Sequence, residues 1–422
     1  MTQERVLTII DRETTYTIGA TDGTTLLQAL RQIPDILLDA PCGGNGNCGK
    51  CKVRILQGEV SPPQPEETHP LAAEELSQGI RLACRTYPLG NQDLPLKIAT
   101  IHGRGTSQVM TGFSGGTPLE VLRFHAQEIH LKSSSVEDQR SQLTRLTDEV
   151  AVHPAMKNPR TLRKLQRQIG RTSLNCLMDQ GKAVALLNPG DNAFGCAIDI
   201  GTTTVVVYLV ELLSGSIVDH RAALNAQKRF GADVISRIEA VSRQANGSEL
   251  LQRSIVQQLD WMAAELCEAH GISEDSLVEL CAVGNTTMLH LLLGVDPATI
   301  AVAPFTPVFT ESLSCPVAQL GFKHISDTYI HLPGSIASYV GADITAGVFA
   351  SGITRQTDPV LFLDIGTNGE IALWDGAQLH CCSSAAGPAF EGASILHGTG
   401  GITGAVSSVS WVRDDQGRIR KS

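Results

Sequence analysis

The stretch PCGGNGNCGKC, from Pro41 to Cys51, places three cysteines in a C-x5-C-x2-C pattern within one glycine-rich loop. A fourth cysteine, Cys84, follows in the segment RLACRT. Thiolates from one loop plus a distant fourth are the arrangement that holds [2Fe–2S] clusters. Glycines supply the positive φ angles and exposed backbone N–H groups that a loop wrapped around a cluster needs. We therefore predict Cys42, Cys48, Cys51 and Cys84 as the metal ligands.

A structural zinc site is the alternative for these cysteines. Structural zinc sites are usually built from two short C-x2-4-C pairs. Only Cys48 and Cys51 form such a pair here, and Cys84 has no second cysteine close to it in sequence. The pattern therefore favours an iron–sulfur cluster over zinc.

Length and composition describe a globular protein of two or three domains, with 422 residues and 42% apolar residues. The net charge of −10 and the absence of a Lys/Arg run argue against nucleic-acid binding. The sequence contains no signal-peptide pattern and no apolar run as long as a membrane span. Without an export signal, the remaining cysteines are expected to be reduced. We predict a cytoplasmic protein that binds neither membranes nor nucleic acids.

The segments around the cysteine loop predict a β-grasp domain over residues 1–100. Apolar residues alternate in the hairpin and strand segments and recur at helical spacing in the helix. The predicted elements are a hairpin, a helix, a strand and two closing strands: Val6–Ile10, Tyr16–Ile18, Thr24–Arg31, Lys52–Gln57, 81–87 and 94–98. The x5 gap resembles the adrenodoxin branch of the ferredoxins more than the plant branch, whose gap is x4. This resemblance implies one-electron transfer.

The next part of the chain shows no motif with recognisable chemistry. Residues 101–118 are rich in glycine, serine and threonine, which predicts a flexible linker. Residues 119–190 carry charge-rich, amphipathic patterns, which predict a small helical connecting domain.

A strand–turn–strand pattern then occurs twice. The first copy is CAIDIGTTTVVVYLV, residues 196–210, and the second is VLFLDIGTNGEIALW, residues 360–374. A repeat of this kind implies two related half-domains that face each other. Glycine lets the backbone approach a phosphate, Thr and Asn groups donate to phosphate oxygens, and Asp positions Mg²⁺ or water. Two ordinary hairpins are the plainer alternative, because a single turn of this kind is common.

The paired turns resemble the phosphate-1 and phosphate-2 loops of the acetate and sugar kinase, heat-shock chaperone and actin superfamily. Fused to an N-terminal [2Fe–2S] domain, they resemble more narrowly the reductive activators of corrinoid enzymes, which are ATP-dependent and return an inactive Co(II) corrinoid to Co(I). Four further stretches match this family: residues 225–238, 283–290, 341–344 and 385–392. The resemblance implies a ribonuclease H-type, two-lobed ATPase domain.

The resemblance also implies which residues bind nucleotide. Asp199 and Asp364 would be the catalytic carboxylates that position Mg²⁺ or water. The residues implied to bind ATP are Gly201, Thr202, Thr203, Thr204, Gly366, Thr367, Asn368 and Gly369. The implied cofactors are therefore a [2Fe–2S] cluster and ATP with Mg²⁺.

Three residues outside these turns have open interpretations. The helix that begins near Asn285 has an N-terminus that could face an anion, or Asn285 could simply cap the helix. His290 is expected to be a core or cap residue. Glu391 is expected to cap or to bridge domains rather than bind metal.

Residues 191–352 are predicted to form the first lobe and residues 353–422 the start of the second. In this superfamily the second half-domain continues further, and its adenosine-binding glycines come later. The stretch GTGGITG, residues 398–404, follows the second turn too closely to be that motif, and it leads to a predicted hairpin. We therefore expect an incomplete second lobe, from a fragment or a truncated gene product, with impaired nucleotide affinity and a whole cluster site.

The leading prediction is ATP-dependent reductive activation of a corrinoid protein, in which the cluster passes one electron to Co(II) and gives Co(I). The expected partners are a corrinoid protein of a methyltransferase system, an upstream electron donor and a second copy of the chain in a homodimer. One alternative is an ATP-dependent activator of another low-potential enzyme. A non-enzymatic alternative is an electron carrier whose truncated, degenerate kinase-like part only binds partners.

Overall fold

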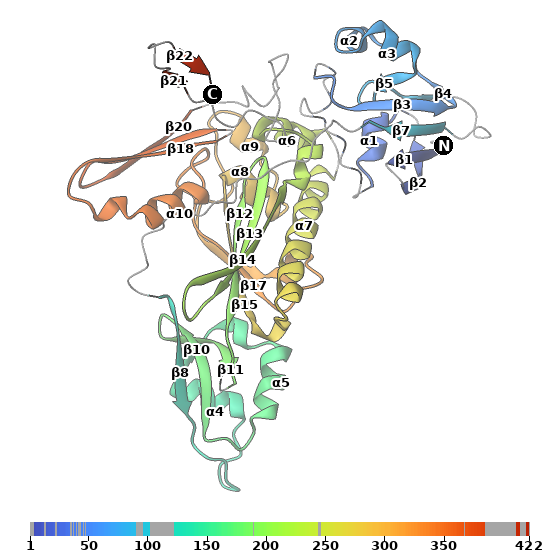
Figure 1. Ribbon diagram of the computed structural model, residues 1–422. Coiled ribbons are helices and arrows are strands. Elements are labelled where there is room, and N and C mark those ends of the chain that lie inside the picture. The colour runs from blue at the N-terminus through green and yellow to red at the C-terminus, as the bar shows by residue number, and fades with distance from the viewer. Residues whose placement is uncertain are drawn as a thin grey trace.

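The computed structural model shows a small N-terminal sheet domain, a connecting domain and a larger two-sheet region that carries the repeated turns (Figure 1). The structure describes these residues: 4–11, 14–21, 23–33, 36, 38, 40, 44, 46, 48–89, 96–101, 122–188, 190–243, 246–366, 368–384, 411–413 and 419–421. The predicted linker from residue 102 on, the stretch 398–404 and Glu391 lie outside them. No helix in the described ranges is long and apolar enough to cross a bilayer.

The N-terminal domain is a mixed five-stranded sheet with strand order β2-β1-β7-β3-β5. β1 and β7 are parallel, and the leucines of α1 pack against the sheet in one core. The elements that form the domain are β1 (Glu4–Asp11), β2 (Thr14–Thr21), α1 (Leu26–Leu30), β3 (Lys52–Gln57), β4 (Glu59–Val60), α2 (Pro65–Thr68), α3 (Ala73–Ser77), β5 (Ile80–Leu82), β6 (Pro88–Leu89) and β7 (Leu96–Thr100). The β-grasp prediction is confirmed. The strand expected over 81–87 is shorter, because the chain turns directly after Leu82, where Arg85 N–H donates to the Leu82 carbonyl (2.9 Å).

The segment predicted to be helical is a mixed domain with a four-stranded sheet of order β8-β10-β11-β9. Its elements are β8 (Phe124–His130), α4 (Gln142–Glu149), β9 (Ala151–Val152), η1 (Pro154–Met156), α5 (Pro159–Arg167), β10 (Ser173–Asp179) and β11 (Lys182–Leu187). The prediction of a helical domain over 119–190 is therefore wrong. β8 is an edge strand in which only Phe124 and Ile129 are buried, so its sequence lacks the apolar alternation that marks a strand.

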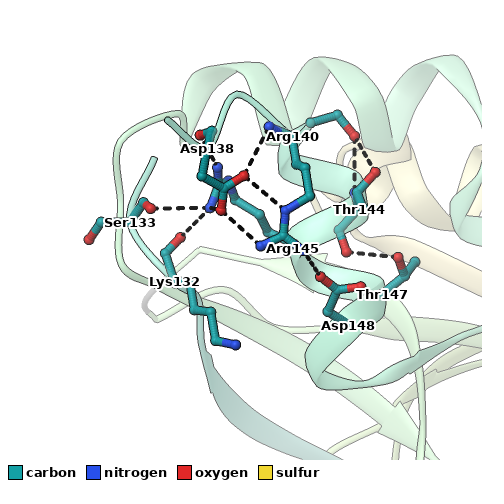
Figure 2. A network of polar contacts seen from close by, with 9 residues as sticks. Lys132, Ser133, Asp138, Arg140, Thr144, Arg145, Thr147 and Asp148 are labelled. Carbon is teal, nitrogen blue, oxygen red and sulfur yellow. Dashed lines mark hydrogen bonds and ion pairs between the residues drawn. The ribbon is translucent and has the colours of Figure 1, made fainter. Parts of the chain in front are cut away.

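A polar network holds the loop between β8 and α4 (Figure 2). Asp138 accepts hydrogen bonds from Arg140 Nε (2.8 Å) and from Arg145 Nη1 (3.1 Å). The buried Arg145 also donates to the carbonyls of Lys132 and Ser133, both at 3.1 Å. These bonds compensate the burial of the guanidinium group. The charge density of this segment therefore has a structural explanation.

The first lobe is built on a six-stranded sheet of order β14-β13-β12-β15-β17-β16, with β12, β15 and β17 parallel. Its elements are β12 (Phe194–Ile200), β13 (Thr204–Glu211), β14 (Ser216–Leu224), η2 (Ala226–Arg229), α6 (Val234–Ser242), α7 (Gly247–Ala269), η3 (Glu274–Ser276), β15 (Leu277–Gly284), α8 (Thr286–Leu292), α9 (Ala298–Ala301), β16 (Leu313–Pro316), η4 (Val317–Leu320) and β17 (Tyr329–Leu332). α7 and α8 pack on the sheet in the largest core of the molecule. Because β12 and β15 are parallel, the turn after β12 and the start of α8 lie at the same sheet edge.

The second copy of the repeat forms a separate three-stranded sheet of order β18-β19-β20. The helix α10 packs on it through Ile344 and Val348, and these contact Ala372 and neighbouring strand residues. The remaining elements are α10 (Ala342–Ser351), η5 (Ile353–Arg355), β18 (Val360–Ile365), β19 (Gly369–Trp374), β20 (Leu379–Ser384), β21 (Trp411–Arg413) and β22 (Ile419–Lys421). β21 pairs with β22, which confirms the predicted C-terminal hairpin.

The connecting domain contacts the first lobe at the sheet edge opposite the turn. Arg123 forms ion pairs with Asp179 (2.8 Å) of its own domain and with Glu279 (2.7 Å) near the start of β15. Beneath them, Phe124 and Leu177 pack in a small core that contacts Val278. The connecting domain is thus placed away from the repeated turns.

Candidate functional site

The turn between β12 and β13 is held from one side by two buried side chains. Asn225 donates through Nδ2 to the carbonyl of Gly201 (2.8 Å), and its backbone N–H donates to the carbonyl of Thr203 (2.9 Å). Arg237, which is fully buried, donates through Nη2 to the carbonyl of Thr202. Burial lowers the pKa of the Arg237 guanidinium to about 9, so this donor is still charged at neutral pH. All three carbonyls of the turn therefore have fixed partners.

These bonds also fix the direction of the backbone N–H groups. In a trans peptide the C=O and the N–H that follows it point in opposite directions. Since the carbonyls of Gly201 and Thr202 face the scaffold, the N–H groups of Thr202 and Thr203 face away from it. Successive N–H groups on one side of a turn form an anion-binding concavity. The side chains of Thr203 and Thr204 are half-buried in the same turn.

The side chain of Thr202 has a structural contact. It is buried, and its Oγ1 accepts a hydrogen bond from Asn285 Nδ2 (3.0 Å). Asn285 also caps α8, because its Oδ1 accepts from the Met288 N–H (3.0 Å). The capping interpretation is thus confirmed. His290 is a core residue as expected: Nδ1 donates to the Thr286 carbonyl (2.7 Å), and Nε2 accepts from Val308 N–H (3.0 Å).

Three glycines allow backbones to meet at this sheet edge. A Cβ atom on Gly201 would lie 2.7 Å from the Thr204 carbonyl oxygen, and one on Gly284 would lie 2.7 Å from the Ile200 carbonyl oxygen. A Cβ atom on Gly341 would lie 2.4 Å from the Cα of Asn285. Only glycine fits at such distances. The first turn, the start of α8 and the start of α10 therefore converge on one place.

The second turn, between β18 and β19, closes a hairpin like the first but is one residue shorter: Ile200 pairs with Val205 in the first hairpin, and Ile365 pairs with Gly369 in the second. Asp364 lies opposite Glu370, and Gly366 N–H donates to the Asn368 carbonyl (2.9 Å) across the turn. In both hairpins the predicted Asp is the next-to-last residue of the first strand. Gly369 begins β19, and Thr367 lies outside the described residues. The repeat seen in the sequence is therefore a repeat of structure as well.

Four carboxylates lie around the two turns, close enough for the charge of one to affect the pKa of another. Asp199 and Asp364 reach solvent, Asp343 at the start of α10 is half-buried, and Glu370 is buried. Crowding by protein atoms raises the pKa of Asp199 to about 6, and the charges of Asp343 and Asp364 contribute to the shift. Burial also raises the pKa of Asp343 to about 6 and of Glu370 to about 7, with Asp364 as a further cause in both. Carboxylates that disfavour one another's charge are stabilised by a divalent cation.

Sequence reasoning missed Asp343 and Glu370 as members of this group. Asp343 lies in a stretch that matches the family, but nothing local to it indicates a carboxylate cluster. Glu370 did carry a signal, because the residue opposite the aspartate is Val206 in the first hairpin and Glu370 in the second. A charged residue where the repeat has a valine departs from the strand pattern.

The cysteine loop folds against the segment that carries Cys84. Gly44 and Gly49 have φ angles of +104° and +66°, as the glycine-rich pattern predicts. A Cβ atom on Gly44 would lie 3.8 Å from the Cβ of Cys84, and Ala83 N–H donates to the Cys51 carbonyl (2.8 Å). Cys51 and Cys84 are buried, and Cys48 is half-buried. Two buried cysteines on hydrogen-bonded segments and a loop with positive-φ glycines fit a protein-bound iron–sulfur cluster.

The complete ligand set stays a prediction. Cys42 lies outside the described residues. Among the residues that are described, no three His, Cys, Asp or Glu side chains gather as they would around a bound metal ion. The fit of the loop therefore rests on its backbone and on the three thiols that are placed.

Comparison with known families assigns three parts of the chain. Residues 9–89 match the profile described as 2Fe-2S iron-sulfur cluster binding domain. Residues 194–356 match the RACo middle region, and residues 358–420 match the C-terminal domain of RACo, the ASKHA domain. A solved structure titled reductive activator for corrinoid, iron-sulfur protein is 30% identical, with a TM-score of 0.61, and the match covers 98% of this chain and 68% of that one.

The chain belongs to the family of reductive activators of corrinoid proteins. Family membership confirms the predicted ferredoxin and ASKHA domains and the [2Fe–2S] cofactor, and the ASKHA match implies ATP as the nucleotide. The zinc alternative is not supported. The domain boundaries predicted from sequence stay predictions.

Two curated relatives match about half of this chain. Corrinoid activation enzyme RamQ of Eubacterium limosum is 33% identical over 216 residues, which are 51% of this chain and 36% of that protein. [Co(II) methylated amine-specific corrinoid protein] reductase of Methanosarcina barkeri is 25% identical over 225 residues, 51% of this chain and 40% of that protein. The aligned part of this chain thus spans well under half of each relative.

Proposed function

We propose that this chain is an ATP-dependent reductive activator of a corrinoid protein. The observation that carries the proposal is the presence, in one chain, of a [2Fe–2S] domain and a pair of Asp-Ile-Gly-Thr turns whose carboxylates influence one another's ionisation. Cys42, Cys48, Cys51 and Cys84 would hold the cluster, which would supply the one electron that converts Co(II) of the partner to Co(I), and an upstream donor would replace that electron. The step transfers no atom to the corrinoid.

The residues of the chain have separate tasks in this proposal. The N–H groups of Thr202 and Thr203 hold phosphate oxygens, because the scaffold fixes their direction. Asp199 and Asp364 hold Mg²⁺, whose charge offsets their mutual repulsion. Nucleotide bound between both turns favours the closed arrangement of the lobes, and this state has a different affinity for the corrinoid partner. ATP binding is thereby coupled to an electron transfer that is otherwise thermodynamically unfavourable.

The partner is proposed to be a corrinoid protein of a methyltransferase system. The names of the two curated relatives, which refer to corrinoid activation and to a methylated amine-specific corrinoid protein, support this class. We further propose that the protein works in the cytoplasm and accepts electrons from a separate low-potential donor.

The test is an anaerobic reduction assay with the full chain, a corrinoid protein in the Co(II) state and a chemical reductant. Loss of the Co(II) absorption and appearance of Co(I) are expected only when ATP and Mg²⁺ are present. Asp364→Asn should abolish the reduction that ATP and Mg²⁺ promote. It should leave the electron paramagnetic resonance signal of the reduced cluster unchanged. Asp358→Asn is the matched control, because Asp358 is an exposed carboxylate near β18.

Two results would contradict the proposal. Equal reduction with reductant alone and with ATP would favour an electron carrier whose kinase-like part only binds partners. A chain that contains zinc and no iron would remove the electron transfer itself.

A further inference from the structure

Arg31 reaches from the N-terminal domain to the first lobe. It directly follows α1, and its Nε donates to the carbonyl of Arg229 at 2.5 Å. Its guanidinium carbon lies 5.5 Å from the centre of the Phe230 ring, within the range of a cation–π contact. Phe230 is 1% exposed and belongs to the main core of the lobe. Arg31 therefore joins a domain that carries the cluster to a fixed residue of the lobe.

On the N-terminal side, α1 connects Arg31 to the segment of a predicted cluster ligand. The first two N–H groups of the helix, on Leu26 and Leu27, donate to the carbonyls of Thr86 and Ala83, both at 2.9 Å. These two carbonyls flank Cys84. One short helix thus spans the distance between the Cys84 segment and the contact with the lobe.

On the lobe side, η2 connects Phe230 to the first phosphate turn. Phe230 N–H donates to the Gln227 carbonyl (2.9 Å), and Gln227 N–H donates to Asn225 Oδ1 (2.9 Å). The same Asn225 holds the carbonyl of Gly201. Arg237 also connects the segment after Phe230 to the turn, because it donates to the carbonyls of Gly231 (3.0 Å) and Thr202. The residues that orient the turn and the residues that receive Arg31 are therefore one hydrogen-bonded unit.

We propose that the Arg31 contact is a docking interface between the [2Fe–2S] domain and the nucleotide lobe, and that docking and nucleotide binding strengthen each other. The inference rests on the proposed function for the identity of the nucleotide. Coupling between two binding events is reciprocal: if docking on Phe230 helps η2 to hold the turn in the conformation that binds nucleotide, nucleotide binding strengthens docking by the same factor. Arg31 acts as a positioning residue through its contacts with Arg229 and Phe230 of the lobe.

Two variants and a control test the docking step. Arg31→Ala removes the donor and the cation, and Arg31→Lys keeps the charge but removes the Nε donor. Arg54→Ala is the control, because Arg54 is an exposed arginine on β3 of the same domain. Amide hydrogen exchange of the full chain is measured over residues 24–33 and 226–231. We expect faster exchange in both segments, by about threefold or more, in Arg31→Ala and a smaller effect in Arg31→Lys.

The coupling step is tested by calorimetry with a non-hydrolysable ATP analogue and Mg²⁺. Arg31→Ala should raise the Kd by roughly three- to tenfold, toward the lower end of typical coupling factors, with Arg54→Ala unchanged. The melting temperature of each variant shows whether a loss of fold explains the change. An unchanged Kd and unchanged exchange in Arg31→Ala would overturn the inference. If the parent chain bound no analogue, the proposed function and the coupling would fail, and the exchange data would still decide whether the domains dock.

Discussion

The two phosphate turns share a sequence pattern but lie in different surroundings. The first belongs to a six-stranded sheet with helices packed on it, and Ile200 beside its aspartate is fully buried. The second belongs to a three-stranded sheet with α10 on one face, and the equivalent Ile365 is 85% exposed. The support of the first turn reaches beyond the sheet, through Asn225 and Arg237.

This difference shows which features the motif itself determines and which depend on the residues packed around it. Asp-Ile-Gly-Thr sets the hairpin and the position of the aspartate in both copies, whatever packs around it. The energy that keeps the turn in one conformation comes from neighbours that the motif does not encode. We therefore expect the first turn to be rigid before nucleotide binds, and the second to gain more of its order from the nucleotide and Mg²⁺.

The largest expected contrast is between the two equivalent isoleucines. Ile200→Ala removes a fully buried side chain and should lower the free energy of unfolding by about 2–4 kcal/mol. Ile365→Ala removes an exposed side chain and should change it by no more than about 0.5 kcal/mol. Urea denaturation of both variants measures the difference. Equal losses would mean that the outer face of β18 is covered in the folded protein. The two turns would then not differ in how deeply their isoleucines are buried.

A smaller contrast is expected between the two equivalent glycines. A Cβ atom on Gly201 meets the Thr204 carbonyl oxygen at 2.7 Å, whereas the nearest described atom to one on Gly366 is at 3.6 Å. Gly201→Ala must therefore shift the turn, at a cost of roughly 1–3 kcal/mol, and should weaken nucleotide binding. Gly366→Ala should cost well under 1 kcal/mol. Thermal denaturation and calorimetry with the ATP analogue are the measurements; a more harmful Gly366→Ala would reverse the assignment of the rigid turn.

The sequence predicted those parts of the site that depend on local geometry. Some patterns indicate the same local structure in most folds: a glycine between two strands, an aspartate before it, and three cysteines in a short loop. The turns and the β-grasp domain could therefore be recognised from the sequence. Asn225, Arg237 and Asp343 could not be placed, because each acts on residues far away in sequence. The connecting domain was mispredicted for a related reason: the polar edge strand β8 is a strand only because β10 pairs with it.

The last expected effect concerns Glu370, which lies opposite Asp364 where the first hairpin has Val206 opposite Asp199. Burial, with Asp343 and Asp364 nearby, raises the pKa of Glu370 to about 7, above its ordinary value of 4.5. Because the folded state binds this proton more tightly than the unfolded state, the ionised carboxylate destabilises the fold above pH 7, and the penalty disappears as the pH falls from 7 to below 4.5.

Glu370→Gln should therefore stabilise the metal-free protein at pH 8 by roughly 1–3 kcal/mol and have no effect near pH 4. Denaturation in the presence of a chelator, repeated across this pH range, measures the gain. Saturating Mg²⁺ with the ATP analogue should reverse the order of stability, because the carboxylate then contributes to cation binding and glutamine does not. A gain that persisted at pH 4 would come from packing, and Glu370 would not belong to the charged group around the turns. A gain confined to high pH and reversed by Mg²⁺ would mean that the second turn gives up stability in the empty protein in order to bind the cation.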